Sequence, residues 1–205
     1  MPKTELIIIG GKPYSGKTSL SKLLGENKDI KIPIRVLSMG ERLRAIGSGK
    51  IKSNYTELLA NSTDALKHHF AVPKEAALAI FEEFVAEQPD SLIILDGFPR
   101  YPDRLEGFEQ SINRLKAKVL AVCRVDVDDS VVFERSKNRE QRYADVAEDD
   151  SFIQKRLEDY QLNVLPTLNA LAHESNLYVL DGTKVFDTNL SKLWEIINSE
   201  SRWVE

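Results

Sequence analysis

The sequence has few of the residues that mark secreted, metal-rich or membrane proteins. It contains one cysteine in 205 residues, Cys123, which excludes an intramolecular disulfide framework and a cysteine-rich metal site. No apolar run approaches the roughly 20 residues that a membrane-spanning helix needs, and the first residues do not read as a secretory signal. Because Cys123 lies within the apolar run Val119–Val125, we expect a buried structural thiol in a cytoplasmic protein.

The sequence also lacks an excess of positive charge. Its 28 Lys and Arg residues are outnumbered by 32 Asp and Glu, giving a formal net charge of -4, whereas proteins that bind nucleic acid or membrane surfaces are usually basic. Hydrophobic residues make up 42% of the chain, enough for a buried core. We therefore expect one compact domain over residues 1–205, monomeric, with neither nucleic acid nor membrane as partner.

Short apolar runs alternate with helical segments along the chain. The expected strands are Leu6–Ile9, Ile34–Leu37, Ser91–Leu95, Val119–Val125 and Leu177–Leu180. The expected helices are Ser19–Leu24, which Gly25 would end, Lys74–Ala86, and the segments near 102–116, 151–173 and 187–198. This alternation predicts an α/β fold whose parallel five-stranded sheet has helices on both faces. The charged stretch Arg135–Asp150 is either a solvated loop or a segment that closes over a charged ligand.

The residues after the first strand match a phosphate-binding pattern. Gly11–Thr18 fits G-x-x-x-x-G-K-[ST] in full, with a strand before it and a helix after it. Backbone N–H groups of such a loop and the positive end of the helix bind phosphate. We expect Lys17 to reach the β- and γ-phosphates of ATP and Thr18 to hold Mg²⁺ as the cofactor. The expected ATP contacts in this loop are Gly11, Lys12, Pro13, Tyr14, Ser15, Gly16, Lys17, Thr18 and Ser19.

A second anchor follows the third expected strand. Asp96 comes directly after the apolar run Leu92–Leu95, and an aspartate at this position in P-loop enzymes supports Mg²⁺, often through water. The sequence Asp96–Arg100 reads D-G-F-P-R, and here the chain resembles the nucleoside monophosphate kinases, the family of adenylate kinase and UMP/CMP kinase. Further similar stretches follow the order of that family: Gly40–Arg44, Val72–Glu75, Glu134–Arg139, Lys155–Tyr160 and Asp181–Lys184.

The resemblance implies a P-loop kinase that transfers the γ-phosphoryl group of ATP to a nucleoside monophosphate. It implies an inserted helical lobe at 38–80 for the monophosphate and a short lid at 135–150. The residues expected around the transferred group are Lys17, Arg100, Arg139, Arg142 and Arg156, with Arg135 and Lys184 as further ATP contacts. The residues expected to bind the monophosphate are Ser38, Met39, Arg44, Val72, Gly97, Arg100 and Arg104. Guanidinium groups suit this chemistry, because phosphoryl transfer depends on positioning and charge stabilisation.

The chain departs from the family at several of these positions. Tyr14 stands where the family usually has glycine, and Met39 replaces a threonine or alanine. Arg104 replaces the glutamine or asparagine that faces the acceptor base. An arginine offers only donors, which suits an acceptor-rich edge such as guanine O6/N7 or a pyrimidine carbonyl. The alternatives at two of these positions are a surface location for Arg104 and an ion pair of Arg156 with Glu158 or Asp159.

Two other functions are consistent with the same motifs. An enzyme of another P-loop class, a small-metabolite kinase or a nucleotide hydrolase, would turn over the triphosphate without a monophosphate. A non-catalytic nucleotide-binding regulator would bind nucleotide without turnover, and the unusual Met39 and Arg104 would favour it. The identity of the acceptor base, AMP, CMP, UMP or GMP, stays open at this point.

Overall fold

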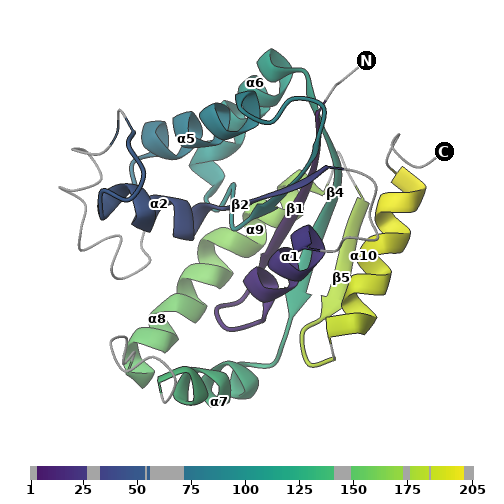
Figure 1. Cartoon of the computed structure of the whole chain (residues 1–205). Coiled ribbons are helices and arrows are strands. Elements are labelled where there is room, and N and C mark those ends of the chain that lie inside the picture. The colour runs from purple at the N-terminus through teal and green to yellow at the C-terminus, as the bar shows by residue number, and fades with distance from the viewer. Residues whose placement is uncertain are drawn as a thin grey trace.

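The fold is built on a five-stranded parallel sheet. The computed structural model describes residues 4–26, 33–53, 55, 72–140, 149–172, 176–184 and 186–200. The strands are β1 (Thr4–Gly11), β2 (Ile34–Ser38), β3 (Leu92–Asp96), β4 (Ala117–Asp126) and β5 (Asn176–Asp181). They lie in the order β2-β3-β1-β4-β5, and each neighbouring pair is parallel (Figure 1). The predicted sheet is therefore confirmed.

Helices connect these strands. The α-helices are α1 (Lys17–Glu26), α2 (Met39–Gly47), α5 (Lys74–Ala86), α6 (Leu105–Leu115), α7 (Asp129–Glu140), α8 (Asp150–Asp159), α9 (Leu165–Leu171) and α10 (Phe186–Glu200). Two shorter segments are η1, a 3-10 turn (Pro102–Arg104), and η2, a π-helical turn (Tyr160–Val164). Within the ranges given above, none of these helices combines the length and apolarity that crossing a bilayer would require.

The core lies on both faces of the sheet. Side chains alternate along a strand, so Leu6 and Ile8 of β1 join one cluster, with residues of α5, α6, η2 and α9. Ile7 and Ile9 join the opposite cluster, with residues of α1 and α10. Figure 1 shows these two helical layers on either side of the strands. The continuous apolar run in β1 thus reflects burial on both faces, which confirms the predicted helix-sheet-helix arrangement.

The strand register brings the functional loops to one edge of the sheet. Ile9 lies opposite Asp96, and Asp96 lies opposite Ser38 at the end of β2. Gly11 lies opposite Val125 near the end of β4. In open parallel sheets the carboxyl ends of the strands are where ligands bind. The phosphate-binding pattern and the Asp96–Arg100 segment therefore start from adjacent strands at the same edge.

Gly25 does not end α1, contrary to the sequence-based expectation. The helix begins at Lys17 and continues to Glu26. A Cβ atom at Gly25 would lie 2.6 Å from Cγ2 of Val36, a distance that real side chains do not tolerate. Glycine at this position therefore lets α1 pack closely against β2.

Helix α7 was missed in the sequence. It covers Asp129–Glu140, so the first part of the charged stretch 135–150 is helical rather than a loop. Its apolar residues are few, and Val132 is fully buried while most of its other side chains are polar. A short apolar stripe of this kind gives little periodic signal. Residues 141–148 of the expected lid lie outside the described residues, as do 54 and 56–71 of the expected lobe.

The single helix expected at 151–173 is divided into three parts. Asp149 begins it as the N-cap of α8, accepting a hydrogen bond from the Phe152 amide at 2.8 Å. The π-helical turn η2 separates α8 from α9, whose second residue is Pro166. Proline has no N–H to donate to the preceding turn, and π-helical turns are often found where a helix register changes. Tyr160 and Asn163, described below, belong to this π-helical turn.

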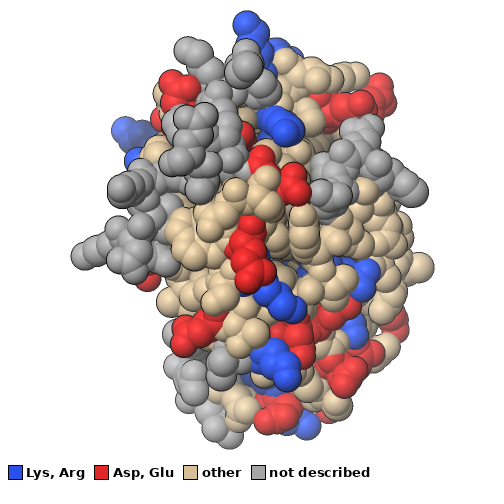
Figure 2. Space-filling model, turned by 90° about the vertical axis from the view of Figure 1, so that its right-hand side faces the viewer, with Lys and Arg blue, Asp and Glu red and all other residues tan. Residues whose placement is uncertain are grey.

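The face that carries α10 has mixed charge. Figure 2 shows acidic and basic side chains interspersed over this side of the molecule. A surface that binds nucleic acid gathers lysine and arginine into a patch or stripe. Among its described residues, this face presents no such patch.

Candidate active site

The loop between β1 and α1 has the backbone that a phosphate cradle needs. A Cβ at Gly11 would lie 2.5 Å from the carbonyl oxygen of Val125, so only glycine fits between the two strands. Gly16 has φ of +93°, a conformation that residues with side chains rarely adopt. Helix α1 begins immediately afterwards at Lys17. The loop and the helix N-terminus therefore form one continuous anion-binding element.

Tyr14 takes an unusual conformation within this loop. Its φ is +58°, the left-handed region that costs a non-glycine residue roughly 1–2 kcal/mol. The ring packs against the apolar cluster of Val127, Val132, Ile153 and Leu157. The Arg156 guanidinium lies over it, 5.4 Å from the ring centroid. Tyr14 thus links the loop to α8, which offsets part of the backbone strain.

Two basic side chains, Lys12 and Arg135, connect the loop to neighbouring elements by hydrogen bonds. Lys12 Nζ donates to the Val127 carbonyl at 2.8 Å and to Asp129 Oδ1 at 2.7 Å. Arg135 donates to the carbonyls of Tyr14 and Ser15, at 3.3 Å each, and to that of Gly182 at 2.8 Å. Both residues were expected to contact ATP. In this structure their side chains bind protein groups and fix the loop against β4, α7 and the turn after β5.

Thr18 and Asp96 meet at the base of the loop. The Thr18 hydroxyl donates to Asp96 Oδ2 at 2.7 Å. Asp96 is 3% exposed, and its Oδ1 has no hydrogen-bond partner among the described residues. Hard divalent cations prefer oxygen ligands, and Mg²⁺ is usually held by one or two protein groups together with water and phosphate. This donor set fits the predicted cation.

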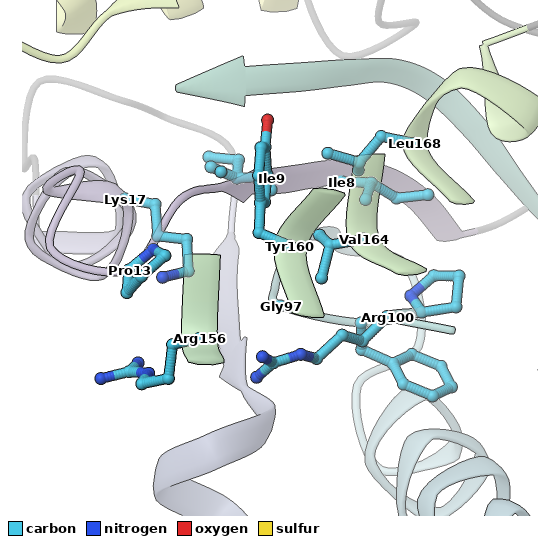
Figure 3. Close-up of a pocket in the computed structure, with 14 residues that line it drawn as sticks. Ile8, Ile9, Pro13, Lys17, Gly97, Arg100, Arg156, Tyr160, Val164 and Leu168 are labelled. Carbon is cyan, nitrogen blue, oxygen red and sulfur yellow. The ribbon is translucent and has the colours of Figure 1, made fainter. Parts of the chain in front are cut away.

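Three cations converge on a pocket beside the loop. Lys17 of α1, Arg100 after β3 and Arg156 of α8 all line it, together with Gly97, Tyr160 and residues of β1. Figure 3 shows these three side chains around the same space, with Tyr160, Val164 and Leu168 forming an apolar wall. Burial raises the pKa of Tyr160 to about 12, so its phenolic hydroxyl keeps its proton at neutral pH. The pocket therefore concentrates positive charge beside apolar surface, an arrangement that attracts phosphate groups.

Arg100 is bound by an acidic residue. Its Nη2 lies 2.5 Å from Asp159 Oδ2. The same carboxylate accepts from the Tyr101 hydroxyl at 3.4 Å and from Asn163 Nδ2 at 2.9 Å. Asp159 thus binds Arg100, and the Arg156 guanidinium lies over the Tyr14 ring.

Arg104 is buried, so its interpretation as a surface residue is wrong. It is 4% exposed, and its Nη2 donates to the Val72 carbonyl at 2.7 Å. Its guanidinium lies 4.7 Å from the centroid of the Tyr101 ring. Burial lowers the pKa of Arg104 from its usual value, but arginine starts so far above neutrality that the group keeps its charge.

The other expected monophosphate contacts lie in different environments. Ser38 ends β2 beside Asp96 in the sheet register. Met39 is 4% exposed and belongs to the hydrophobic core, so its side chain serves packing. Arg44 is exposed in the last turn of α2. Gly97 has φ of +73° with open space where a side chain would be, which leaves room beside the pocket.

The other residues expected to contact ATP or the transferred group are exposed, buried in the loop, or outside the described residues. Ser19 is exposed on α1, and Lys184 is exposed in the turn after β5. Pro13 and Ser15 are buried within the loop. The backbone of Arg139 belongs to α7, while its side chain and the whole of Arg142 lie outside the described residues.

Sequence reasoning missed the residues that position Arg100. Tyr101 and Asn163 were assigned no role, and Asp159 was considered only as a partner of Arg156. No local pattern marks them, because they surround Arg100 only after η1, α8 and η2 have packed together. The one available signal was the position of Asp159 within the Lys155–Tyr160 stretch.

A family model described as AAA domain matches residues 10–152, which include the loop, Asp96 and Arg100. The chain belongs to this AAA domain family. The match covers most of the chain and includes the end of β1 and all of β2, β3 and β4. Together with the parallel sheet, it confirms the predicted P-loop α/β fold.

This member of the AAA domain family is also similar to curated adenylate kinases. It is 27% identical to adenylate kinase from Deinococcus radiodurans over 88% of this chain and 90% of that protein. It is 26% identical to the Parvibaculum lavamentivorans adenylate kinase over 96% of this chain and 93% of the relative. The match to the Hydrogenobaculum adenylate kinase, 28% identical, spans 65% of this chain and 59% of that protein. These similarities confirm the predicted membership of the nucleoside monophosphate kinase family.

Proposed function

We propose that this protein is a nucleoside monophosphate kinase that transfers the γ-phosphoryl group of ATP to a nucleoside monophosphate with the help of Mg²⁺. The observation that carries the proposal is the convergence of Lys17, Arg100 and Arg156, from three distant segments, on one pocket beside the phosphate-binding loop. A hydrolase needs cations only around the triphosphate. Cations contributed by the segment after β3 and by α8 suit an enzyme that holds two phosphorylated ligands facing each other.

The reaction needs no protein nucleophile. An oxygen of the acceptor phosphate attacks the γ-phosphorus of ATP, the bond from that phosphorus to the β–γ bridging oxygen breaks, and ADP and a nucleoside diphosphate are formed. Lys17 would hold the β- and γ-phosphates, and Arg156 would neutralise negative charge on the γ-phosphoryl group during its transfer. Arg100 would hold the acceptor phosphate. Fixed cations of this kind stabilise the transition state without having to reorganise.

Thr18 and Asp96 would hold the Mg²⁺ ion of this reaction. When bound, the ion neutralises charge on the β- and γ-phosphate oxygens of ATP. The Asp96 carboxylate is kept in position by the Thr18 hydroxyl at 2.7 Å, and its other oxygen is available for a water or ion.

Asp159 binds Arg100 in this structure. Its carboxylate, at 2.5 Å, takes the place that an acceptor phosphate would require. A phosphate with two negative charges binds guanidinium more strongly than a carboxylate with one, so the acceptor would displace Asp159 from Arg100. Residues 38–80 and 135–150 would then close over the acceptor and donor, excluding the water that would otherwise accept the phosphoryl group.

A coupled assay tests the proposal directly. ATP is offered with AMP, CMP, UMP, GMP and their deoxy forms, and formation of ADP is measured with and without each monophosphate. The expected result is ADP formation that depends on a monophosphate and on Mg²⁺. Phosphate release without any monophosphate would identify a hydrolase, and nucleotide binding without turnover would identify a regulator.

A bisubstrate inhibitor provides a second test that does not depend on turnover. A dinucleoside pentaphosphate spans both sites, so its binding should raise the melting temperature well above the shift produced by ATP alone. An equal shift with both ligands would argue against a second nucleotide site.

A further inference from the structure

Tyr14 is held in its strained conformation through both its backbone and its ring. Its φ of +58° is one that glycine adopts freely and that other residues avoid. Arg135 donates hydrogen bonds to the carbonyls of Tyr14 and Ser15, at 3.3 Å each. The ring, in turn, packs against the buried cluster that includes Ile153 and Leu157 of α8. Strain of this kind persists only where the surrounding structure fixes it, and it is concentrated at functional sites.

The ring of Tyr14 also contacts a residue of the phosphate pocket, Arg156. This arginine lies directly before Leu157 on α8, and its guanidinium is 5.4 Å from the centroid of the ring. Attraction between a cation and the face of an aromatic ring extends to about 6 Å. In Figure 3 the Arg156 side chain extends away from Arg100, toward the side of the pocket where Lys17 lies. The contact therefore holds this guanidinium at the end of the pocket formed by the phosphate-binding loop.

The two arginines of the pocket are held in different ways. Arg100 is bound by a carboxylate, that of Asp159 at 2.5 Å, which an acceptor phosphate would have to displace. The face of the Tyr14 ring attracts the Arg156 guanidinium without cancelling its charge and without supplying a competing anion. An arginine side chain has many rotamers, so restricting it before the nucleotides bind reduces the entropy that is lost later. A cation that is already in place stabilises developing charge without having to reorganise.

We propose that Tyr14 is a positioning residue of the phosphoryl transfer: its ring keeps the Arg156 guanidinium beside the phosphate-binding loop before the nucleotides bind. This inference rests on the proposed kinase function and adds to it a residue at which the sequence departs from the family. Glycine would adopt the backbone conformation of Tyr14 without strain, but it has no ring to hold an arginine. The order given to Arg156 offsets the strain of a tyrosine at this position.

Three substitutions separate the ring of Tyr14 from its backbone. Tyr14→Phe keeps the aromatic face, so kcat should stay within about twofold of the parent value. Tyr14→Leu keeps an apolar side chain in the same backbone conformation but has no aromatic face, so kcat should fall about three- to thirtyfold, the range of one cation–π contact. Tyr14→Gly removes the strain together with the ring, so kcat should fall at least as far although the loop adopts its conformation more easily. Equal kcat in the Phe and Leu variants would overturn the proposal.

The division of the effect between kcat and KM distinguishes positioning from packing. If Tyr14 only shaped the loop, Tyr14→Leu would weaken ATP binding and raise KM of ATP with little change in kcat. If it positions Arg156, kcat should fall while KM of ATP changes by less than about threefold, because the group affected acts in the transition state. A raised KM of ATP with an unchanged kcat would therefore refute the positioning role.

A double-mutant cycle in kcat assigns the effect to Arg156. Arg156→Met removes the guanidinium but keeps a long side chain. In that background Tyr14→Leu should lower the residual kcat by less than about twofold, because the group that the ring positions is gone. Tyr178→Leu is the matched control, since this partly buried tyrosine bonds to α10 and does not line the pocket, and it should leave kcat unchanged in both backgrounds. An undiminished effect of Tyr14→Leu in the Arg156→Met protein would overturn the proposal.

Urea unfolding of the same proteins tests the contact without turnover. The loss of stability caused by Tyr14→Leu should be smaller in the Arg156→Met background, because the ring and the guanidinium stabilise each other. Strictly additive losses would show that the two groups do not interact, and the proposal would fall. Absence of turnover by the parent protein with every monophosphate would instead overturn the kinase function, while coupling in the unfolding cycle would still show that Tyr14 holds Arg156.

Discussion

The Thr18 hydroxyl joins the phosphate-binding loop to the end of β3. Its hydrogen bond to Asp96 crosses 78 positions of sequence and links these two segments directly. Asp96 is nearly inaccessible to solvent, so the carboxylate depends on this partner. The same hydroxyl is proposed to hold the Mg²⁺ ion.

Replacing this hydroxyl should affect both stability and turnover. Thr18→Val preserves the side-chain shape but leaves Asp96 buried without its donor, so the free energy of unfolding should fall by about 1–3 kcal/mol. Kinase turnover should fall with it and should not recover at high Mg²⁺. Urea unfolding and a Mg²⁺ titration of turnover measure the two effects. Thr18→Ser, which retains the hydroxyl, is the control; equal stability and turnover for the valine and serine variants would contradict this role.

Lys17, at the start of α1, and Arg100, after β3, line the same pocket. Lys17→Ala and Arg100→Ala should each reduce kcat/KM at least about a hundredfold, because each removes a charge contact made in the transition state. Steady-state kinetics with both substrates varied should place the Lys17 effect on ATP and the Arg100 effect on the acceptor. Lys118→Ala and Arg114→Ala, at exposed positions, serve as controls. Near-normal turnover in either site variant would rule out the proposed assignment.

Among the elements, α8 and η2 together position four residues of the site. Arg156 and Asp159 belong to α8, and Tyr160 and Asn163 belong to η2. The position of this unit depends on how α8 starts, because Asp149 caps its first turn and residues 141–148 precede it. A loosened first turn would shift both the cation over Tyr14 and the carboxylate that holds Arg100.

The Asp149 cap predicts a dependence of stability on pH. Hydrogen bonds from the Ser151 hydroxyl and the Phe152 amide hold the pKa of Asp149 below its usual value. The stabilisation is therefore complete above the unfolded-state pKa of about 3.9 and is lost as the pH falls through the lower folded-state pKa. Asp149→Ala should lower the urea midpoint at neutral pH, and the difference from the parent protein should shrink in acid. Asp150→Ala, which removes a neighbouring acid without the cap, should show a smaller effect; equal effects at neutral pH would contradict the cap.

At the scale of the whole molecule, the sheet encloses a single buried thiol. Cys123 is fully buried in β4, between β1 and β5, and burial raises its pKa to about 12. The thiolate that would react with an alkylating reagent is therefore scarce and inaccessible in the folded protein. Its modification requires the strand to separate from its neighbours.

Cys123 should thus report global unfolding. In native buffer at pH 8, its labelling by a thiol reagent should be at least about a thousandfold slower than in denaturant, the factor expected from typical stabilities. ATP should slow it further because it binds only the folded state. A Cys123→Ala protein that also carries Lys118→Cys, at an exposed position of the same strand, should label rapidly without denaturant. Rapid native labelling of Cys123 would mean that β4 opens locally.

Much of the fold follows from local sequence patterns. The alternation of apolar runs and helices determines a parallel sheet, because each short strand must be buried on both faces. The spacing of Gly11, Gly16 and Lys17 determines the phosphate-binding loop, because only glycine takes the required backbone conformations. Helix α7 was not predicted because its apolar residues, Val131, Val132 and Phe133, are consecutive and do not recur at helical spacing.

The partners of the charged side chains were decided by the tertiary structure alone. Arg100 and Asp159 are separated by 59 positions, and Arg104 and Val72 by 32. A charged residue in a sequence has many possible partners. The partner that it binds in the folded protein depends on how the helices pack and on how far water is excluded. For this reason the sequence left Arg104 open as a base contact or a surface residue, and its burial against Tyr101 excludes the second. The sequence by itself determined which phosphate chemistry the chain can attempt; the packing of α8, η2 and η1 around Tyr101 decided how its arginines are held.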